Sequence, residues 1–126
     1  MKLLLDTCAL IWWTLDQKKI SAPTLAVLNS SEMLLSSISI WEVGIKIKNK
    51  KLDIGMSIDV YAEKLTELST IQILPVTDKI WVKNLGLEWE HRDPADRTIV
   101  ATAMVHDCWI VTTDQIIHDY YPRIFW

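Results

Sequence analysis

Residues 91–97 read HRDPADR and lead directly into TIVATAMV at residues 98–105. This pattern predicts a helix start, with Asp93 as the N-cap, Pro94 at the first helical position and Asp96 at the third. The predicted helix carries an apolar face with core-facing spacing, formed by Ile99, Val100, Ala103 and Met104. Two acids lie within one helical turn, where the helix dipole favours negative charge. One of them completes the cap, so the second needs another explanation.

The bulk composition is that of one globular domain spanning residues 1–126. Of these residues 50% are hydrophobic and 23% are charged, which excludes a disordered chain. The net charge of −3 excludes a broadly basic nucleic-acid-binding surface, although not a local basic patch. Three leucines before Asp6 are too few for a signal-peptide core, and no apolar run is long enough to cross a bilayer. We therefore expect a soluble, cytoplasmic protein, with Cys8 and Cys108 as reduced core thiols.

Short apolar segments alternate with helical patterns along the chain. The predicted strands are residues 3–5, 33–35, 71–74 and 109–112, with a further strand or irregular segment at 124–125. The predicted helices are residues 7–16, 22–29 capped by Ser21, 39–50, 57–69, 78–85 ended by Gly86, and the helix after Asp93. Strands that are apolar throughout, each followed by a helix, indicate a mostly parallel sheet that is covered on both faces. The predicted fold is a three-layer α/β/α sandwich.

Two of these helices carry specific expectations about their residues. Ser39 and Glu42 fit a capping box, with serine at the cap and glutamate at the third helical position. The helix at 57–69 is amphipathic. Its predicted inward residues are Ile58, Ala62, Leu65 and Leu68.

Four acids fall at places that a parallel sheet would bring together. Asp6 and Asp114 each follow a predicted strand directly, at the edge where open parallel sheets bind ligands. Glu42 and Asp96 each lie in the first turn of a predicted helix, and such helices often begin at that same edge. Four carboxylates in one cleft repel one another unless some are protonated or a cation lies among them. Carboxylate oxygens suit Mg²⁺ or Mn²⁺, and such an ion can activate a water for phosphodiester hydrolysis.

Each acid also has a purely structural interpretation. Asp6 and Asp114 could each cap the helix that follows, and Glu42 could be only one half of a capping box. Asp93 is assigned mainly to capping. Asp96 could be a surface acid that the helix dipole stabilises.

The sequence resembles the PIN domain, and within it the small VapC-type toxins of toxin–antitoxin pairs. The matching segments are Leu4-Leu5-Asp6-Thr7, Ser39-Ile40-Trp41-Glu42-Val43, the heptad at residues 91–97, and Val111-Thr112-Thr113-Asp114. Their order and spacing cover almost the whole chain.

The resemblance implies a Mg²⁺- or Mn²⁺-dependent endoribonuclease with a site made of Asp6, Glu42, Asp96 and Asp114. It also implies a homodimer, and an antitoxin of the VapB or Phd type that blocks the active site and binds operator DNA. Asp93 matches an additional acid of the subgroup that carries this heptad, so it is a candidate to support the site or a metal-bound water.

Several other polar residues are candidates for supporting roles. Thr7 and Thr112 resemble hydroxyl positions beside the family's site, where they orient a carboxylate or a water, but either could simply bond a nearby carbonyl. Arg97 could pair with a phosphate or with Asp93, and a salt bridge on the helix surface is the favoured interpretation. His91 is interpreted as a hydrogen-bonding loop residue rather than a general base.

The remaining candidates for RNA contact are basic or aromatic. Lys46, Lys48, Lys50 and Lys51 form the only dense basic run. It is either a solvated helix end or a patch that follows the phosphates of RNA. Trp12, Trp13 and Trp41 are expected in core or dimer packing, and Trp89 is the best candidate for stacking on a base.

Two other function classes fit the sequence less well than the nuclease. A non-catalytic PIN-like module that binds RNA or protein has no reason to retain all four acids. A receiver-like phosphoacceptor domain usually carries adjacent N-terminal acids and a late strand-end lysine, and both are absent here.

Overall fold

The sheet of the computed structural model, which describes residues 1–126, has five strands in the order β3-β2-β1-β4-β5. Its strands are β1 (Lys2–Leu5), β2 (Glu32–Ser36), β3 (Ile71–Leu74), β4 (Trp109–Val111) and β5 (Ile124–Phe125). All four strand pairs are parallel, and β1 lies at the centre with Leu5 opposite Leu35 on one side and Val111 on the other. Parallel strands need crossover connections, which the helices provide.

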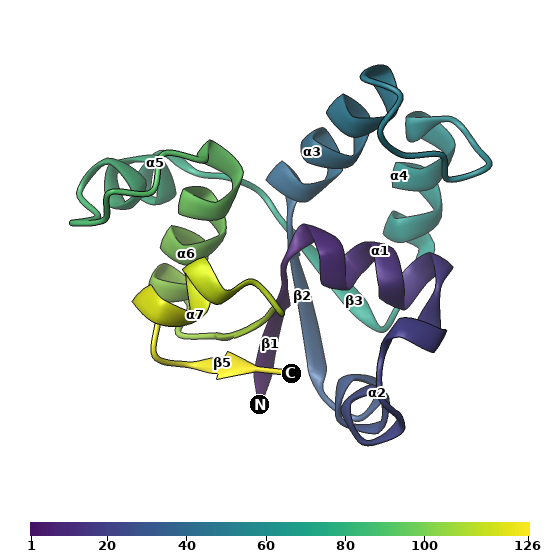
Figure 1. The fold of residues 1–126 in the computed structure, drawn as a ribbon, viewed down its shortest axis with the longest axis horizontal. Coiled ribbons are helices and arrows are strands. Elements are labelled where there is room, and N and C mark those ends of the chain that lie inside the picture. The colour runs from purple at the N-terminus through teal and green to yellow at the C-terminus, as the bar shows by residue number, and fades with distance from the viewer.

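Helices cover both faces of this sheet (Figure 1). The helices are α1 (Thr7–Leu15), α2 (Ala22–Asn29), α3 (Ser37–Lys48), α4 (Ile58–Glu67), α5 (Asp78–Leu85), α6 (Pro94–His106) and α7 (Gln115–Tyr120), with a short 3₁₀ turn at Gln17–Lys19. Figure 1 shows α1 to α4 on one side and α5 to α7 on the other. The predicted three-layer α/β/α sandwich is confirmed, and none of these helices is both long and apolar enough to span a bilayer.

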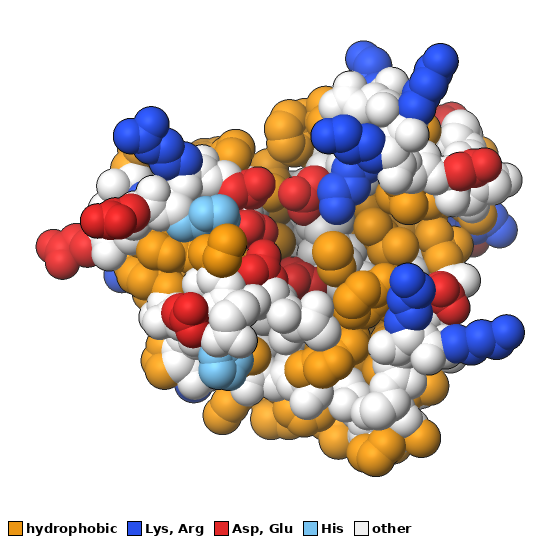
Figure 2. All heavy atoms as spheres, in the orientation of Figure 1, with side chains coloured by type: hydrophobic (Ala, Val, Ile, Leu, Met, Phe, Trp, Pro, Cys, Tyr) orange, Lys and Arg blue, Asp and Glu red, His pale blue; other side chains and the backbone are white.

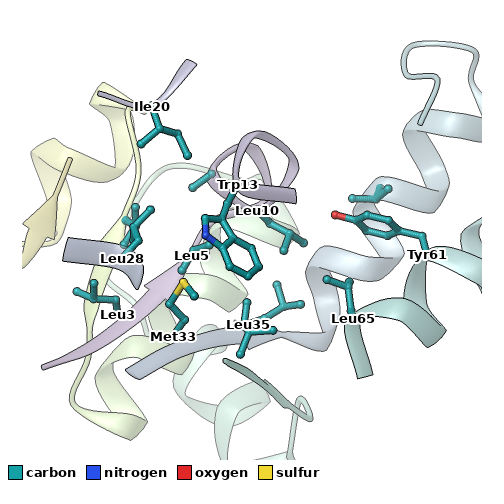
Figure 3. Packing of buried hydrophobic residues seen from close by; sticks show 14 of the residues in the cluster. Leu3, Leu5, Leu10, Trp13, Ile20, Leu28, Met33, Leu35, Tyr61 and Leu65 are labelled. Carbon is teal, nitrogen blue, oxygen red and sulfur yellow. The ribbon is translucent and has the colours of Figure 1, made fainter. Parts of the chain in front are cut away.

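The apolar strands supply two separate cores because successive side chains point to opposite faces. Leu3 and Leu5 belong to the core under α1, α2 and α4, whereas Leu4 belongs to the core under α6 and α7. Figure 3 shows strand side chains of the first core lying beside Leu10 and Trp13 of α1. The sheet is therefore held from both faces, which fixes the edge from which α1, α6 and α7 start.

Three local predictions were wrong. The helix α3 starts at Ser37 and is capped by Ser36, whose Oγ accepts from the Ile38 N–H at 3.2 Å, so Ser39 and Glu42 form no capping box. The reason is that β2 extends to Ser36, which pairs with Leu74 of β3, and the helix follows at once. Leu68 lies beyond the end of α4 and is exposed, and Tyr61 takes the predicted inward place.

The expected burial of both cysteines is wrong for one of them, and the three tryptophans expected in core or dimer packing lie in different environments. Cys108 is buried as predicted, but Cys8 is exposed on the second residue of α1. Trp13 lies in the core, Trp12 packs edge-on against Trp126, and Trp41 is 53% exposed. Trp41 is therefore not a core residue of the single chain.

Leu4 is fully buried at the centre of the sheet. We expect Leu4→Ala to lower the free energy of unfolding by about 2–5 kcal/mol, because the neighbouring strands cannot collapse into the space. Urea denaturation followed by circular dichroism measures this. Val60→Ala on the exposed face of α4 is the control and should change stability by less than about 0.5 kcal/mol. Equal losses in the two variants would contradict the assignment of β1 as the core strand.

Candidate active site

The four predicted acids come together at the C-terminal edge of the sheet. Asp6 follows β1 and Asp114 lies three residues after β4, while Asp96 is the third residue of α6 and Glu42 the sixth of α3. Asp6 lies within electrostatic range of Asp96 and Asp114, and Asp96 within range of Asp93, Asp114 and Glu42. Figure 2 shows acidic side chains gathered in a central hollow between the two halves of the molecule. We call Asp6, Glu42, Asp93, Asp96 and Asp114 the acidic cluster.

Asp6 is both a helix cap and a member of this cluster. Its Oδ1 accepts from the Ala9 N–H at 2.8 Å, which caps α1, and its Oδ2 accepts a hydrogen bond from the Thr112 hydroxyl. Thr112 Oγ1 in turn accepts from the Asp114 N–H at 2.9 Å. Thr112 therefore orients a carboxylate, which is one of its two predicted roles, and ties the ends of β1 and β4 together.

Burial makes two carboxylates of this cluster, Asp6 and Asp96, costly to ionise. It raises the pKa of Asp6 to about 6, against the lowering effect of the hydrogen bonds from Thr112 and Ala9, and the charges of Asp96 and Asp114 raise it further. The pKa of Asp96 is raised mainly by burial, although its hydrogen bond with His91 lowers it. A positive charge among these side chains would remove the penalty.

Two further caps position the other aspartates. Asp93 Oδ1 accepts from the Asp96 N–H at 2.9 Å, which confirms the predicted cap of α6. Asp114 Oδ1 accepts from the Ile116 N–H at 2.9 Å and caps α7. The capping and site interpretations of Asp6 and Asp114 are thus compatible, because a carboxylate that caps a helix keeps lone pairs for other partners.

Glu42 opens onto a groove of about 260 Å³ that adjoins the cluster. Lys46 and Lys51 also line this groove, together with Asp93 and the exposed Trp41. The basic run is therefore split, since Lys48 and Lys50 are exposed but do not line the groove.

Arg97 differs from its prediction, since it forms no salt bridge. Its guanidinium donates to one carbonyl oxygen near the end of α5, to three carbonyl oxygens of the loop that follows, and to the Asn84 side chain. The carbonyls and their distances are Asn84 2.7 Å, Leu87 3.2 Å, Trp89 2.7 Å and His91 3.1 Å. The hydrogen bonds of Arg97 thus hold the segment between the end of α5 and α6, and they occupy the N–H donors that a salt bridge would need.

Trp89 and Thr7, the aromatic candidate and one of the two hydroxyl candidates, both contact other side chains of the protein. Trp89 stacks on Tyr120 with ring centroids 4.5 Å apart and planes 7° from parallel, so that ring face is not available to a base. The Thr7 hydroxyl donates to Ser39 Oγ at 3.0 Å between α1 and α3. Ser39 was missed as a site neighbour because it was assigned to a cap; its position three residues before Glu42 on the same helix face was the available signal.

The donor set of the cluster fits a hard divalent cation. It consists of carboxylate oxygens alone, and burial makes the negative charges of Asp6 and Asp96 costly to keep without a cation beside them. No group of three or more His, Cys, Asp or Glu side chains is arranged closely enough to hold an ion by itself. Mg²⁺ commonly keeps several waters and takes only one or two protein carboxylates directly, which is compatible with this spacing.

Comparison with known proteins agrees with this architecture. The PIN domain family matches residues 3–121. The chain is 25% identical over 123 residues to "Ribonuclease VapC22" of Mycobacterium tuberculosis, covering 95% of this chain and 93% of that protein. Among solved structures, a toxin–antitoxin complex from Klebsiella pneumoniae is similar with a TM-score of 0.66 at 19% identity, covering 98% and 96% of the two chains. VapBC2 from Rickettsia felis, bound to a DNA fragment from its promoter, gives 0.67 at 17% identity, covering 99% and 96%. At these identities the structures show a shared fold.

The contacts of Arg97 predict a large effect of a small change. We expect Arg97→Lys to lower the free energy of unfolding by about 2–4 kcal/mol, because a lysine cannot donate to four carbonyls at once and hydrogen bonds from charged donors are among the stronger ones. Arg92→Lys, at an exposed position of the same heptad, is the matched control. Thermal melting of both variants measures the difference. Equal melting temperatures would contradict the stabilising role assigned to the Arg97 hydrogen bonds.

The raised pKa of Asp6 predicts a pH-dependent stability. Between about pH 4 and pH 6 Asp6 binds more protons in the folded chain than in the unfolded chain, so its contribution to wild-type stability falls as the pH rises through this window. Asn is an equally good cap, and it does not titrate. We therefore expect the stability gain of Asp6→Asn over wild type, in EDTA, to grow by up to about 3 kcal/mol from pH 4 to pH 7.

Urea denaturation across this pH range measures the gain. Asp59→Asn is the control, since Asp59 is an exposed acid on α4 whose pKa is lowered by a hydrogen bond from Ser57. Its stability gain should not grow with pH. If the stability gain of Asp6→Asn over wild type did not change with pH, the raised pKa assigned to the buried Asp6 carboxylate would be contradicted.

Proposed function

The chain belongs to the PIN-domain family, and from this membership together with the acidic cluster we propose that it is a metal-dependent endoribonuclease, the toxin of a type II toxin–antitoxin pair. The observation that carries the proposal is that carboxylates from four separate segments share one hollow at the C-terminal edge of the sheet. A protein without a cation to bind gains nothing from this repulsion. The likeness to a protein named ribonuclease over almost the whole chain supports the same activity.

In this proposal Asp6, Glu42, Asp96 and Asp114 hold Mg²⁺ or Mn²⁺. When bound, the ion supplies an activated water and stabilises negative charge on a phosphoryl oxygen. The chain's own residues do the positioning. Thr112 holds Asp6 through a hydroxyl hydrogen bond, and Asp93 fixes the first turn of α6 so that Asp96 faces the hollow.

Lys46 and Lys51 are the basic residues best placed to contact the RNA. They line the groove that also contains Glu42 and Asp93, so a phosphate held there lies next to the acidic cluster. Their positive charges offset the repulsion between the cluster and a polyanionic substrate. Lys48 and Lys50 lie between these two lysines in the sequence, are exposed at the end of α3, and extend this basic surface.

The proposed partners are an antitoxin of the VapB or Phd type and a second copy of the chain. One of the similar structures is a toxin–antitoxin complex, which supports the antitoxin. An apolar groove between α1 and α4, lined by Trp13, Leu15, Met56 and Leu68 among others, is a surface that such a protein could cover. Exposed apolar side chains on α5, at Trp81, Val82 and Leu85, are of the kind that dimer interfaces bury.

Asp96→Asn and Glu42→Gln test the activity. We expect each to lower Mn²⁺-dependent cleavage of total cellular RNA at least about 100-fold, because each removes one ionised oxygen ligand worth several kcal/mol of charge stabilisation. Mapping the cut ends by sequencing gives both rate and site. Asp59→Asn on the exposed face of α4 removes an acid outside the cluster and should cleave as wild type.

EDTA provides a second control in the same assay. Cleavage by wild type in EDTA at the same rate as in Mn²⁺ would overturn the proposed metal dependence. Wild-type protein that binds RNA or an antitoxin but cuts nothing in Mn²⁺ would favour a non-catalytic binding module instead.

A further inference from the structure

We propose that His91 is a positioning residue that holds the Asp96 carboxylate in the orientation needed to receive the divalent ion. The inference rests on the proposed function and deepens it, by assigning to the loop before α6 a role in metal affinity. The observation is a contact of 2.7 Å between His91 Nε2 and Asp96 Oδ2, with both side chains about four-fifths buried.

The His91 ring is itself held from several directions. Arg97 donates to the His91 carbonyl at 3.1 Å and to the Trp89 carbonyl at 2.7 Å. The Trp89 ring packs against the His91 ring, with 4.9 Å between centroids, and also stacks on Tyr120 of α7. The loop is thus anchored to α6 through its backbone and to α7 through a stacked ring, which leaves His91 little freedom to move.

Two adjacent residues at the start of α6 both bind His91. Asp96 contacts the His91 ring, and the next residue of the helix, Arg97, donates to the His91 backbone carbonyl. A rigid loop can hold a carboxylate in one rotamer only if its own backbone is fixed, and Arg97 meets this requirement. The five hydrogen bonds of Arg97 therefore help to orient the Asp96 carboxylate as well as to stabilise the fold.

Electrostatics explains why Asp96 needs to be held. Asp93, Asp114 and Glu42 all repel its charge, so a free Asp96 side chain would turn towards water and away from the cluster. His91 engages Oδ2, and the structure gives Oδ1 no hydrogen-bond partner. One oxygen is therefore fixed while the other remains for a ligand. Such outer hydrogen bonds to metal-binding side chains commonly change metal affinity 10- to 100-fold when removed.

A pair of substitutions separates the hydrogen bond from the packing. His91→Phe keeps an aromatic ring against Trp89 but removes the N–H donor, whereas His91→Gln keeps an N–H donor at a similar reach but removes the ring. We expect His91→Phe to weaken Mn²⁺ binding about 10- to 100-fold, and His91→Gln to stay within about threefold of wild type. His118→Phe, at an exposed histidine of α7, is the matched control and should bind as wild type.

The measurement is a titration of Mn²⁺ into the metal-free full chain, followed by the electron paramagnetic resonance signal of the free ion. Melting temperatures in EDTA accompany it. Equal losses for Phe and Gln, no loss for either, or a metal-free variant that fails to fold would each overturn the inference, because His91 would then act in packing or folding alone.

Metal binding and RNA cleavage are read separately, so the two proposals fail in different ways. If wild type binds Mn²⁺ but cuts no RNA, the proposed nuclease activity is overturned and the comparison of the His91 variants remains valid. If wild type cuts RNA and the His91→Phe variant binds Mn²⁺ as well as wild type does, only the positioning role of His91 is overturned. Wild type that does not bind Mn²⁺ overturns both.

Discussion

The crowding of carboxylates at the C-terminal edge of the sheet is the constraint on which the rest of the structure depends. Asp6, Asp96 and Asp114 lie within electrostatic range of one another, and each is restrained by a cap at a helix start. The N–H groups of Ala9 and Ile116 bind Asp6 and Asp114, while Asp93 binds the N–H of Asp96. Three helices, α1, α6 and α7, thus begin at one edge of the sheet, and the positive ends of their dipoles offset part of the negative charge.

The two-faced core makes this convergence possible. Alternate residues of β1 belong to separate clusters on opposite faces of the sheet, so α1 is held on one side and α6 and α7 on the other. The acids reach the same hollow from both layers because β1 and β4 are adjacent and parallel. Thr112 then connects the layers directly, through Asp6 on one side and the Asp114 backbone on the other.

The sequence was sufficient to predict the strands, the fold class and the edge at which the acids meet, because these follow from apolar runs and the order of elements. The caps at Asp6, Asp93 and Asp114 were also predictable, since capping depends on neighbours within three residues. The capping box at Ser39 failed because several serines compete there, and the pairing of Ser36 with β3 decides among them. The partners of Arg97 are carbonyls of an irregular loop, whose direction no local pattern specifies.

The exposed thiol of Cys8 gives experimental access to this edge of the molecule. Cys108 is buried and neither cysteine forms a disulfide, so a maleimide fluorophore should attach to one place in the native protein. That place is the residue after Thr7, within electrostatic range of Asp6, Glu42 and Asp114. Partial burial and the nearby acids raise the pKa of the Cys8 thiol, so labelling is slow at neutral pH and quickens in mild alkali. A dye there reports the arrival of an ion, a nucleotide chain or an inhibitor protein without any engineered residue.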